Sequence, residues 1–310
     1  MNTNNVSKDE YKRLVVKPFS KFDTPEFIEL NAHKVDEVKY FIFSNNKNRF
    51  GLAGGVKDSI LKFPFSATFG CFSEISFNNS IEHYHSSIAS LNNWAAKNSI
   101  KKIIFSLPAL SYDLSGITKM QNALFCNKYK LETFDLNFEY MLNLHSEYYL
   151  QNLKAKPRSR YKIALNAGLR ASKTEDSQKV YEIIKINRDQ KGYPLWMSYD
   201  DVVNTSEIIP TDYFIVETEN NVAIASAVVH NLTENVVRVV YWGNKLEYNN
   251  LNPTNFLAKF IFDYYKEKNK QIVDIGTSTL DSIPNNGLCD FKEHIGCTCS
   301  PKATYVMELV

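Results

Sequence analysis

Hydrophobic and polar positions along this chain follow two different periods, and the same order of periods occurs twice. The first occurrence begins with the apolar run 40–43 and continues through further short runs rich in aromatic residues. A helical segment follows at 81–97, and Asn98 leads into another apolar run at 100–105. Short apolar runs bounded by turn residues predict strands, whereas apolar positions three and four apart predict a helix. We therefore expect three antiparallel strands, a helix and a further strand.

The second occurrence keeps this order from residue 213 onwards. The apolar run 213–216 opens it, Asn252 and Pro253 mark the start of a helix that reaches residue 268, and a strand is expected at 271–275. Asparagine is a favoured helix cap, and proline is a favoured first helical residue. The unpaired amino end of this helix points back to the end of the preceding strand, so the pattern predicts a place for a phosphate or a carboxylate.

The repeat predicts the fold class and the domain boundaries. Each copy ends in a short helix and a closing strand, expected at 138–141 in the first copy and at 305–307 in the second. This order indicates two copies of an α/β (α+β) unit of roughly 110 residues, with mixed, mostly antiparallel sheets flanked by helices. We expect a first domain at 1–145, a connecting arm at 146–173 and a second domain at 174–310. A single mixed α/β domain with incidental similarity is the alternative.

The connecting arm carries the strongest charge cluster of the sequence. Its apolar positions have helical spacing, and Pro157 is expected to end the first half of the arm. The cluster is either a solvated helix face or a phosphate-facing surface. Arg158 and Arg160 are the candidate phosphate or tRNA-backbone contacts, because guanidinium groups match phosphates bidentately. The basic residues of this cluster, with no acidic residue among them, are Lys154, Lys156, Arg158, Arg160, Lys162, Arg170 and Lys173.

Composition and charge narrow the class of protein. A chain of 310 residues with 44% hydrophobic and 23% charged residues is typical of a globular protein with one large or two medium-sized cores. The net charge of +2 does not by itself indicate nucleic-acid binding, and DNA is not an expected partner. The five cysteines lack metal-site spacing, so we expect reduced thiols in a cytoplasmic protein. Residues 1–10 are polar and no run of about eighteen apolar residues occurs, so neither an export signal nor an integral membrane span is expected.

Several catalytic classes are disfavoured by missing motifs. No Gly-x-Ser-x-Gly elbow, Walker phosphate loop or His-Glu-x-x-His sequence occurs. His83 and His85 lie two apart on a predicted helix and so point to different faces, which argues against a shared metal. Hydrolase, nucleotidase and zinc-peptidase functions therefore lose support, and no metal site is expected.

Two stretches resemble a known family. Residues 153–169 of the arm contain basic residues, arginine and a small-residue helix that enters the second domain, and Gly287 is followed by Phe291, Lys292 and Gly296. Together with the doubled unit, these stretches resemble the FemABX-like transferases, which have a tandem acetyltransferase-like (GNAT) fold. The resemblance covers nearly the whole chain. It implies two tandem GNAT-like domains and the transfer of an acyl or aminoacyl group onto an amine.

The same resemblance indicates the co-substrates. FemABX enzymes place an aminoacyl group from charged tRNA onto a peptidoglycan-precursor peptide, and relatives with this fold use acyl-CoA. Here the loop at 249–254 has no glycine and Pro253 has no N–H, whereas a GNAT pyrophosphate loop needs glycines for close approach to the phosphates. Acetyl-CoA in its usual pose is therefore disfavoured. Acyl-CoA or aminoacyl-tRNA is the expected co-substrate, tRNA is a candidate partner, and the acceptor is a small molecule or a peptide precursor of the cell envelope. No covalently bound cofactor is expected.

The candidate reaction centre lies in the second copy. Asp274 and Ser278 flank a strand end, where α/β proteins commonly place their sites, and Tyr241 ends the preceding strand. Asp274 is a candidate base or holder of the acceptor amine, with a structural hydrogen-bond acceptor as the alternative. Tyr241 is a candidate proton relay or oxyanion donor, with simple core packing as the alternative. The candidate catalytic residues are thus Asp274, Tyr241 and Ser278.

The candidate binding residues surround this centre. Lys292, preceded by Phe291, is expected to contact a phosphate or an oxyanion, and a surface lysine covering Phe291 is the alternative. Asn255 would add a donor in the first turn of the helix. Trp196 and the two tyrosines of the aromatic-rich loop 193–199, Tyr193 and Tyr199, either line a pocket or plug the core edge. The alternative function is a catalytically inactive binding protein of the same fold for a small acylated or phosphorylated ligand.

Overall fold

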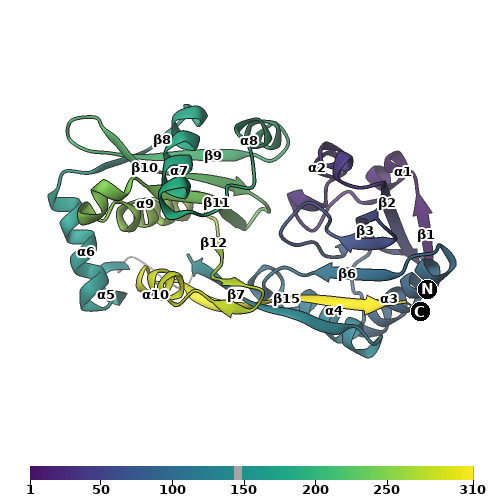
Figure 1. Cartoon of the computed structure of the whole chain (residues 1–310). Coiled ribbons are helices and arrows are strands. Elements are labelled where there is room, and N and C mark those ends of the chain that lie inside the picture. The colour runs from purple at the N-terminus through teal and green to yellow at the C-terminus, as the bar shows by residue number, and fades with distance from the viewer. Residues whose placement is uncertain (143–148, 310) are drawn as a thin grey trace. The chain divides into compact units, whose positions relative to one another are not determined.

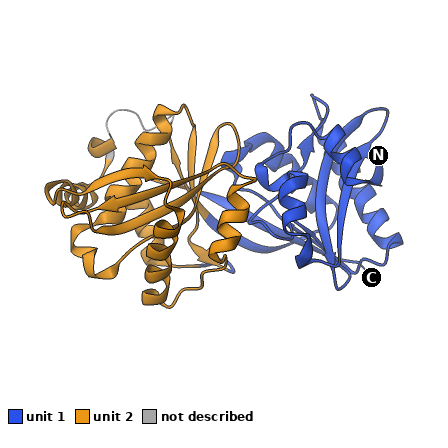
Figure 2. Ribbon diagram, turned by 90° about the horizontal axis from the view of Figure 1, so that it is seen from above, with its two compact units in different colours: residues 1–136, 281–283, 300–310 blue, residues 137–280, 284–299 orange. Residues whose placement is uncertain are grey.

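The computed structural model describes residues 1–142 and 149–309, and the chain divides into two compact units (Figures 1 and 2). Unit 1 contains Met1–Leu136, Asp281–Ile283 and the residues from Ser300 onwards, and unit 2 contains Asn137–Leu280 and Pro284–Cys299. The strands β7 (Lys130–Met141) and β15 (Thr298–Glu308) contribute residues to both units. Each unit is therefore assembled from more than one stretch of the chain.

Unit 1 is built on a sheet in which five neighbouring strand pairs follow the order β1-β2-β3-β4-β6-β15. All neighbours are antiparallel except β4 and β6, which are parallel. A parallel pair requires a crossover connection, and α3 (Ile81–Lys97) supplies it. The other strands of this unit are β1 (Asn2–Val6), β2 (Glu37–Ser44), β3 (Asn48–Lys57), β4 (Ile60–Phe63), β5 (Ser73–Glu74, beside β3) and β6 (Lys102–Ser106).

The core of unit 1 is rich in aromatic side chains. Phe63 and Phe105, on the two parallel strands, stack with ring centroids 4.7 Å apart, and the ring of Phe41 meets Phe63 edge-on. Aromatic rings bury large areas, so a short strand such as β4 still contributes much to the core. The remaining helices are α1 (Lys8–Leu14), α2 (Pro25–Leu30) and α4 (Leu114–Cys126), with the 3-10 turns η1 (Lys21–Asp23), η2 (Ala32–Lys34) and η3 (Leu110–Tyr112).

Unit 2 repeats the order of strand directions found in unit 1. Its sheet has the order β8-β9-β10-β11-β12-β7, and all neighbours are antiparallel except β11 and β12. The helix α9 (Pro253–Glu267) makes the crossover between these two parallel strands. The strands are β8 (Arg170–Thr174), β9 (Thr211–Glu217), β10 (Ala223–Asn231), β11 (Val236–Asn244) and β12 (Ile272–Thr277), and the short strands β13 (Thr279–Leu280) and β14 (Ile283–Pro284) pair with each other.

Two helices cover opposite faces of the sheet in unit 2. On β9, Tyr213 packs in a cluster with Val180 of α7 (Ser177–Lys191), whereas the next residue, Phe214, meets Phe260 of α9. Successive residues of a strand point to opposite faces, so α7 and α9 lie on opposite faces. The other helices are α5 (Tyr149–Asn152), α6 (Ala155–Asn166), α8 (Tyr199–Ser206) and α10 (Asn286–His294), with the 3-10 helix η4 (Leu246–Leu251).

The predicted fold class, α/β with mixed, mostly antiparallel sheets flanked by helices, is confirmed, but the closing strands of the two copies are exchanged. β7, predicted to close the first copy, pairs with β12 of unit 2, where Met141 lies opposite Ile272. β15, predicted to close the second copy, pairs with β6 of unit 1, where Thr304 lies opposite Ser106. The alternation of side chains predicts a strand and its buried face, whereas the backbone groups that pair it are the same at either edge.

The exchange also places the unit boundaries elsewhere than the expected domains 1–145 and 174–310. Residues from Ser300 onwards belong to unit 1, and the described part of the expected arm, residues 149–173, falls within unit 2, while residues 146–148 lie outside the described residues. The described part of the arm forms α5, α6 and most of β8, and α5 ends before Pro157. Pro157 lies in the first turn of α6, where the missing N–H has no helical partner to lose.

The exchange predicts which strand depends on β15. Val306 lies opposite Ile104 in the antiparallel pair of β15 and β6. Val306→Pro removes a backbone N–H from a strand that has neighbours on both sides, so we expect faster amide hydrogen exchange in β6 by about tenfold or more. Hydrogen–deuterium exchange followed by mass spectrometry measures this, and β10 in the same sample is the internal control. Loss of protection in β12 ahead of β6 would contradict the exchange.

Candidate functional site

The two parallel strands of unit 2, β11 and β12, continue past the last residues that pair with each other. The parallel register joins Val236–Arg238 to Ile272–Asp274, and the two strands then continue, β11 to Asn244 and β12 to Thr277. In the extension of β12, Gly276 has a φ of 78°, which lies in the left-handed region that glycine adopts readily. Ligand sites in α/β sheets form at the carboxyl ends of parallel strands. This end of unit 2 is therefore where a site is expected.

Asp274 holds the backbone of β12 from one side at Gly276, where the strand bends. Its buried carboxylate accepts hydrogen bonds from the N–H of Gly276 (2.8 Å) and from Nδ2 of Asn137 (2.9 Å), and it forms an ion pair with Arg238 of β11. Removing one partner from a buried ion pair costs about 3–5 kcal/mol, because the other charge stays buried. Asp274 thus ties β11, β12 and β7 together at the point where the bend begins.

Lys292 of α10 holds the same bend from the other side. Its side chain is 2% exposed, and Nζ donates hydrogen bonds to the carbonyl oxygens of Gly276 (2.8 Å) and Thr277 (2.9 Å). The ammonium also lies 5.5 Å from the centre of the Phe138 ring. Burial lowers the pKa of Lys292 to about 8, and the negative charge of Asp274 acts in the opposite direction. Lys292 therefore fastens α10 to the end of β12.

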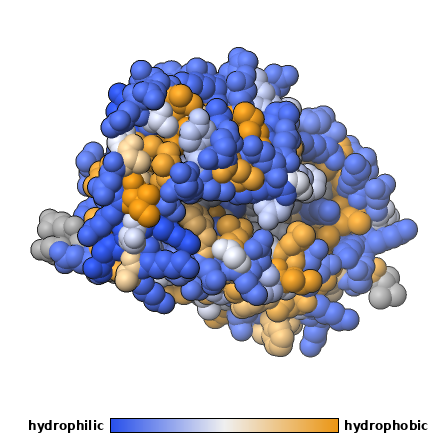
Figure 3. All heavy atoms as spheres, turned by 60° about the vertical axis from the view of Figure 1, so that its left-hand side comes forward, coloured by the Kyte–Doolittle hydropathy of each residue, from blue (hydrophilic) through white to orange (hydrophobic). Residues whose placement is uncertain are grey.

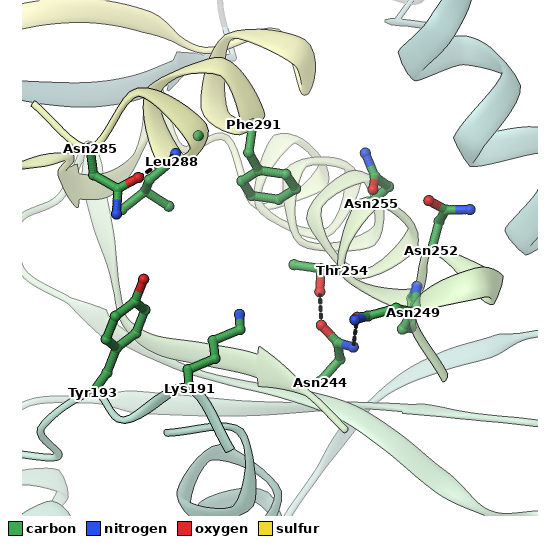
Figure 4. Close-up of a pocket in the computed structure, with 12 residues that line it drawn as sticks. Lys191, Tyr193, Asn244, Asn249, Asn252, Thr254, Asn255, Asn285, Leu288 and Phe291 are labelled. Atoms are coloured by element: carbon green, nitrogen blue, oxygen red, sulfur yellow. Dashed lines mark hydrogen bonds between the residues drawn. The ribbon is translucent and has the colours of Figure 1, made fainter. Parts of the chain in front are cut away.

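The start of α10 forms one wall of a pocket of about 450 Å³ (Figure 4). This volume is in the range of small-molecule sites, about 300–1,000 Å³. Lys191 points toward the space between Phe291 and Thr254, and the hydroxyl of Tyr193 points toward Asn285 and Leu288 (Figure 4). The lining residues come from the end of α7, the loop after it, the end of β11, the loop to α9 and the starts of α9 and α10: Lys191, Tyr193, Asn244, Asn249, Asn252, Pro253, Thr254, Asn255, Asn285, Gly287, Leu288 and Phe291.

The start of α9 offers fewer backbone donors than a usual helix start. Pro253 has no N–H, and the N–H of Asn255 donates to the carbonyl of Asn252 (3.1 Å), which leaves Thr254 to supply a backbone donor in the first turn. Asn252 has a φ of 52° and makes no side-chain cap. The sequence predicted a binding site for a phosphate or a carboxylate at the start of this helix. The pocket does lie there, but side chains supply most of its polar groups.

Asn244 organises the polar wall of the pocket. Its side-chain oxygen accepts a hydrogen bond from the hydroxyl of Thr254 (2.9 Å), and its nitrogen donates to Oδ1 of Asn249 (2.8 Å) and to the carbonyl of Lys245 (2.9 Å). Figure 4 shows the bonds to Thr254 and Asn249 at the pocket edge. The end of β11, the loop 245–251 and the start of α9 are thereby held in one arrangement.

The last turn of α7 carries two cationic side chains, and one of them, Lys191, lines the pocket. Partial burial, and then the charge of Arg188, lower the pKa of Lys191. Burial also lowers the pKa of Arg188, whose guanidinium lies 5.7 Å from the centre of the Tyr241 ring. The helix ends at Gly192, which has a φ of 66°, as predicted from the sequence.

Two of the predicted site residues, Phe291 and Asn255, line the pocket. The ring of Phe291 meets Trp242 edge-on at 5.8 Å. Asn255 is 8% exposed, and its side chain forms no hydrogen bond with any residue that the structure describes. Asp274 and Lys292 are buried and engaged as described above, and neither is among the lining residues.

Tyr241 and Ser278 are also buried and are not lining residues. The Tyr241 hydroxyl accepts a hydrogen bond from the N–H of Met197 (3.3 Å), and burial raises the pKa of Tyr241. Ser278 Oγ has no hydrogen-bond partner among the described residues, while its carbonyl accepts a bond from the N–H of Asn285 (2.9 Å). A direct part of these two residues and of Asp274 in catalysis stays a prediction.

The remaining predicted residues lie outside the pocket. Trp196 is 84% exposed, which fits neither core packing nor a place within the pocket wall. Arg158 donates to the carbonyls of Gln151 (3.2 Å) and Leu153 (2.8 Å), so it holds the corner between α5 and α6, and Arg160 is half-buried.

On the face drawn in Figure 3, hydrophobic residues form small groups among hydrophilic ones. Isolated exposed apolar side chains are ordinary for a folded protein.

Sequence reasoning did not single out four lining residues. Asn244 and Thr254 look like strand-end and first-turn residues, and Asn285 looks like an ordinary helix cap, which it also is, because Oδ1 accepts from the N–H of Leu288 (3.0 Å). Lys191 precedes the predicted helix stop at Gly192. The available signal was position: all four lie at the ends of elements, where α/β proteins gather their sites. Tyr193, one of the two tyrosines of the loop 193–199, does line the pocket.

No cluster of metal-ligating side chains occurs within residues 1–142 and 149–309. No helix in the same part of the chain has the length and apolar character needed to cross a membrane.

Comparison with solved structures identifies the fold. The chain matches FemX with a TM-score of 0.73 and 12% identity, covering 100% of this chain and 98% of FemX. L-PGS from Bacillus licheniformis matches with a TM-score of 0.61 and 10% identity over 97% of this chain and 92% of that one. A tandem GNAT protein from the clavulanic acid biosynthesis pathway matches with a TM-score of 0.53 and 9% identity, covering 99% and 98%. The chain therefore has the FemABX-like tandem GNAT fold, as the resemblance implied.

These likenesses concern the fold alone. No family model matches the sequence. No curated protein matches it either.

The burial of Lys292 predicts a pH-dependent contribution to stability. An unfolded lysine keeps its proton up to a pH of about 10.5, whereas folded Lys292 loses it near pH 8, so the unfolded chain binds more protons between these values. Stability of the wild type relative to Lys292→Met should therefore rise by about 2 kcal/mol from pH 8 to pH 10. Urea unfolding of both proteins at the two pH values measures the difference. An unchanged difference would show that Lys292 is not buried as described.

Proposed function

We propose that this chain is an N-acyltransferase whose reaction centre lies in unit 2. The observation that carries the proposal is the pocket beyond the parallel register of β11 and β12, in a chain whose fold matches FemX over its whole length. Sites at such strand ends bring together groups from several elements, here from α7, β11, α9 and α10.

The reaction class makes modest demands on the protein. The nitrogen of a neutral amine attacks the carbonyl carbon of the activated acyl group, and a C–N bond forms. The C–S bond of a thioester or the C–O bond of an aminoacyl-tRNA ester breaks, and the leaving sulfur or oxygen takes up the proton that the amine loses. Orientation of the two reactants contributes about 7–11 kcal/mol in favourable cases, so donors to the oxyanion and a shaped pocket supply much of what is needed.

Unit 2 is better suited to this role than unit 1. In unit 1, all four residues of β4 pair with β6, so that this strand does not run beyond its partner's register. At the start of α3, the N–H of Ser80 donates to Nδ1 of His83 (3.1 Å), and the N–H of His83 donates to the carbonyl of Ser80 (3.1 Å). The start of α9 has no side-chain cap and opens onto the pocket. We therefore assign binding and transfer to unit 2.

The donor is an acyl-CoA or an aminoacyl-tRNA, and the acceptor is an amine such as that of a cell-envelope precursor. The FemABX resemblance supports the aminoacyl-tRNA donor, and so does the positive surface of the arm. Because Arg158 is engaged with backbone carbonyls, the arm cations left for a phosphate backbone are the exposed Lys154, Lys156 and Lys162 and the half-buried Arg160. Phosphate contacts of this kind are sequence-independent, which suits a donor recognised mainly by its backbone.

A binding protein without catalytic activity is the second candidate. One observation favours it: none of the twelve lining residues is an aspartate, a glutamate or a histidine, so the pocket wall offers neither a carboxylate nor an imidazole as a general base. A transferase with this wall would depend on orientation and oxyanion stabilisation. A binding protein would need neither.

A transfer assay separates the two candidates. The full chain is incubated with acyl-CoAs or aminoacyl-tRNAs and with amine acceptors, including UDP-linked muropeptides, and products are identified by mass spectrometry. A transferase gives an acceptor whose mass has increased by that of the acyl group. A rise in melting temperature with an acceptor alone, and no product from any pair of substrates, would support the binding protein instead.

The hydroxyl of Tyr193 is the candidate donor to the oxyanion or to the leaving group, because it points into the pocket beside Lys191 (Figure 4). Tyr193→Phe keeps the ring and removes the hydroxyl, so kcat should fall by at least about tenfold while KM changes little. Tyr199→Phe is the matched control, because the Tyr199 hydroxyl lies 3.0 Å from Oγ of Ser177 and does not line the pocket. Equal kcat values in both variants would remove Tyr193 from the reaction.

A further inference from the structure

We propose that a small cavity in unit 1 binds the protonated head group of a primary amine against the buried carboxylate of Asp23. The cavity lies among η1, α2 and the residues 64–67 that follow β4, in the unit drawn in blue in Figure 2. It shares no lining residue with the pocket of unit 2. This second site is therefore independent of the proposed transfer reaction.

Asp23 is a buried carboxylate that no cation of the fold neutralises. Its side chain is 6% exposed, and no lysine, arginine or histidine in the described part of the chain forms an ion pair with it. Oδ2 accepts hydrogen bonds from the N–H (3.2 Å) and the hydroxyl (2.6 Å) of Ser20, and the N–H of Cys71 supplies a third. A carboxylate accepts about four hydrogen bonds, so one position is left for a ligand.

The titratable groups packed around Asp23 add no positive charge. Burial raises the pKa of Asp23 to about 7, although its three hydrogen bonds lower it. Burial, and then the charge of Asp23, raise the pKa of Tyr11 on α1 and of Cys71, so both side chains are uncharged at neutral pH. Weaker effects on Cys71 come from two further carboxylates, those of Asp113 and Glu74. A cation is therefore the occupant that complements this environment.

The walls beside Asp23 are aromatic. The rings of Phe22, Phe27 and Phe65 line the cavity. Phe22 and Phe27 have ring centroids 5.2 Å apart and planes tilted by 49°, so these two rings do not stack face to face. Aromatic ring faces attract ammonium groups electrostatically, whereas small metal cations prefer a shell of oxygen ligands. A carboxylate among aromatic rings thus favours an ammonium group over a metal ion.

The exposed end of the cavity has the opposite charge. Nζ of Lys34 donates to Oδ1 of Asn31 (2.7 Å) and to Oγ of Ser66 (2.9 Å), and both of these residues line the cavity. Lys34 is exposed, and it is held by these two oxygens rather than by Asp23. An amine that carries a carboxylate on the neighbouring carbon would therefore meet a complementary charge at each end.

The size of the cavity limits what enters it. Its volume of about 10 Å³ accommodates one group the size of a water molecule, which suits an –NH₃⁺ head group whose remaining atoms lie outside. An amine held in this way keeps its proton, because the Asp23 carboxylate favours the charged form. The nucleophile of an acyl transfer must be neutral, so the reacting amine is not the one bound here.

Thermal unfolding of the full chain in methylammonium chloride tests this site. A ligand that binds the folded state raises the melting temperature, and the dependence on concentration gives a Kd. Sodium chloride and tetramethylammonium chloride at the same ionic strength are the references, and neither should produce this rise. Asp23→Asn keeps the shape of the side chain and removes its charge, so the Kd for methylammonium should rise at least about tenfold.

A second variant blocks the cavity without changing Asp23. Ala53 lines the cavity from β3, and Ala53→Val fills the space with a residue that suits a strand, so it should also weaken binding at least about tenfold. Glu82→Gln is the matched control, because it removes an exposed carboxylate of the same unit that does not line the cavity.

The pH dependence provides a separate readout. Methylammonium, like a lysine side chain, keeps its proton between pH 6 and pH 8, whereas Asp23 changes from mostly protonated to mostly ionised over this range. Binding requires the ionised carboxylate. The Kd should therefore fall about tenfold from pH 6 to pH 8 in the wild type and stay constant in Asp23→Asn.

Several results would overturn the proposal: no rise in melting temperature with methylammonium, an equal rise with sodium or tetramethylammonium, an unchanged Kd in Ala53→Val, or an equal loss in Glu82→Gln. A Kd for the wild type that does not change between pH 6 and pH 8 would also contradict it. Glycine in place of methylammonium then identifies the ligand class. Tighter binding of glycine assigns an amino acid whose carboxylate meets Lys34, and tighter binding of methylammonium assigns a simple amine.

Discussion

One residue of β12, Gly276, is held from both sides by groups of opposite charge, and the arrangement of the pocket depends on these two contacts. The N–H of Gly276 donates to Asp274, and the carbonyl of Gly276 accepts from Lys292. Both charges are buried, and each is compensated by hydrogen bonds rather than by water. The glycine lets the backbone take the left-handed conformation between them. Lys292 fastens α10 to the backbone of β12 at Gly276 and Thr277. The positions of Asn285 and Phe291 at the pocket therefore depend on the backbone conformation at Gly276.

The polar wall of the pocket shows how a scaffold can set the preference of a site without charged residues in contact with one another. Asparagine offers both a donor and an acceptor, so an asparagine-rich wall has no inherent polarity. The fold supplies it for three of these residues: Asn244 and Asn285 each meet a backbone group that can act in one sense only, and Asn249 is oriented by its bond with Asn244. The same bonds connect β11, α9 and the loop between them, so the polarity of the wall and the shape of the pocket have a common origin.

Much of the fold could be predicted from the sequence, because period and punctuation are local properties. The helix at 81–97, the stop at Gly192 and the repeated order of elements are all present in the structure. Strand partners are a long-range property, and the exchange of β7 and β15 was therefore missed. A pocket does lie in unit 2 at the helix tip that the sequence singled out, with Phe291 and Asn255 in its wall, while the catalytic roles stay predictions. Burial was harder to foresee: nothing local in Phe291-Lys292 indicates that the lysine turns inward to two carbonyls while the neighbouring ring faces the pocket.

The exchanged closing strands bear on the order in which the chain can reach its native state during synthesis. β7 is already available when β12 emerges from the ribosome, so the sheet of unit 2 can be completed at that point. The sheet of unit 1 includes β1, which starts at residue 2, and yet it waits for β15, which follows every strand of the unit 2 sheet in the chain. The edge of β6 must therefore remain without this partner while all of β8 to β12 are made. A nascent chain of this design is exposed to mispairing at that edge, which a chaperone could protect.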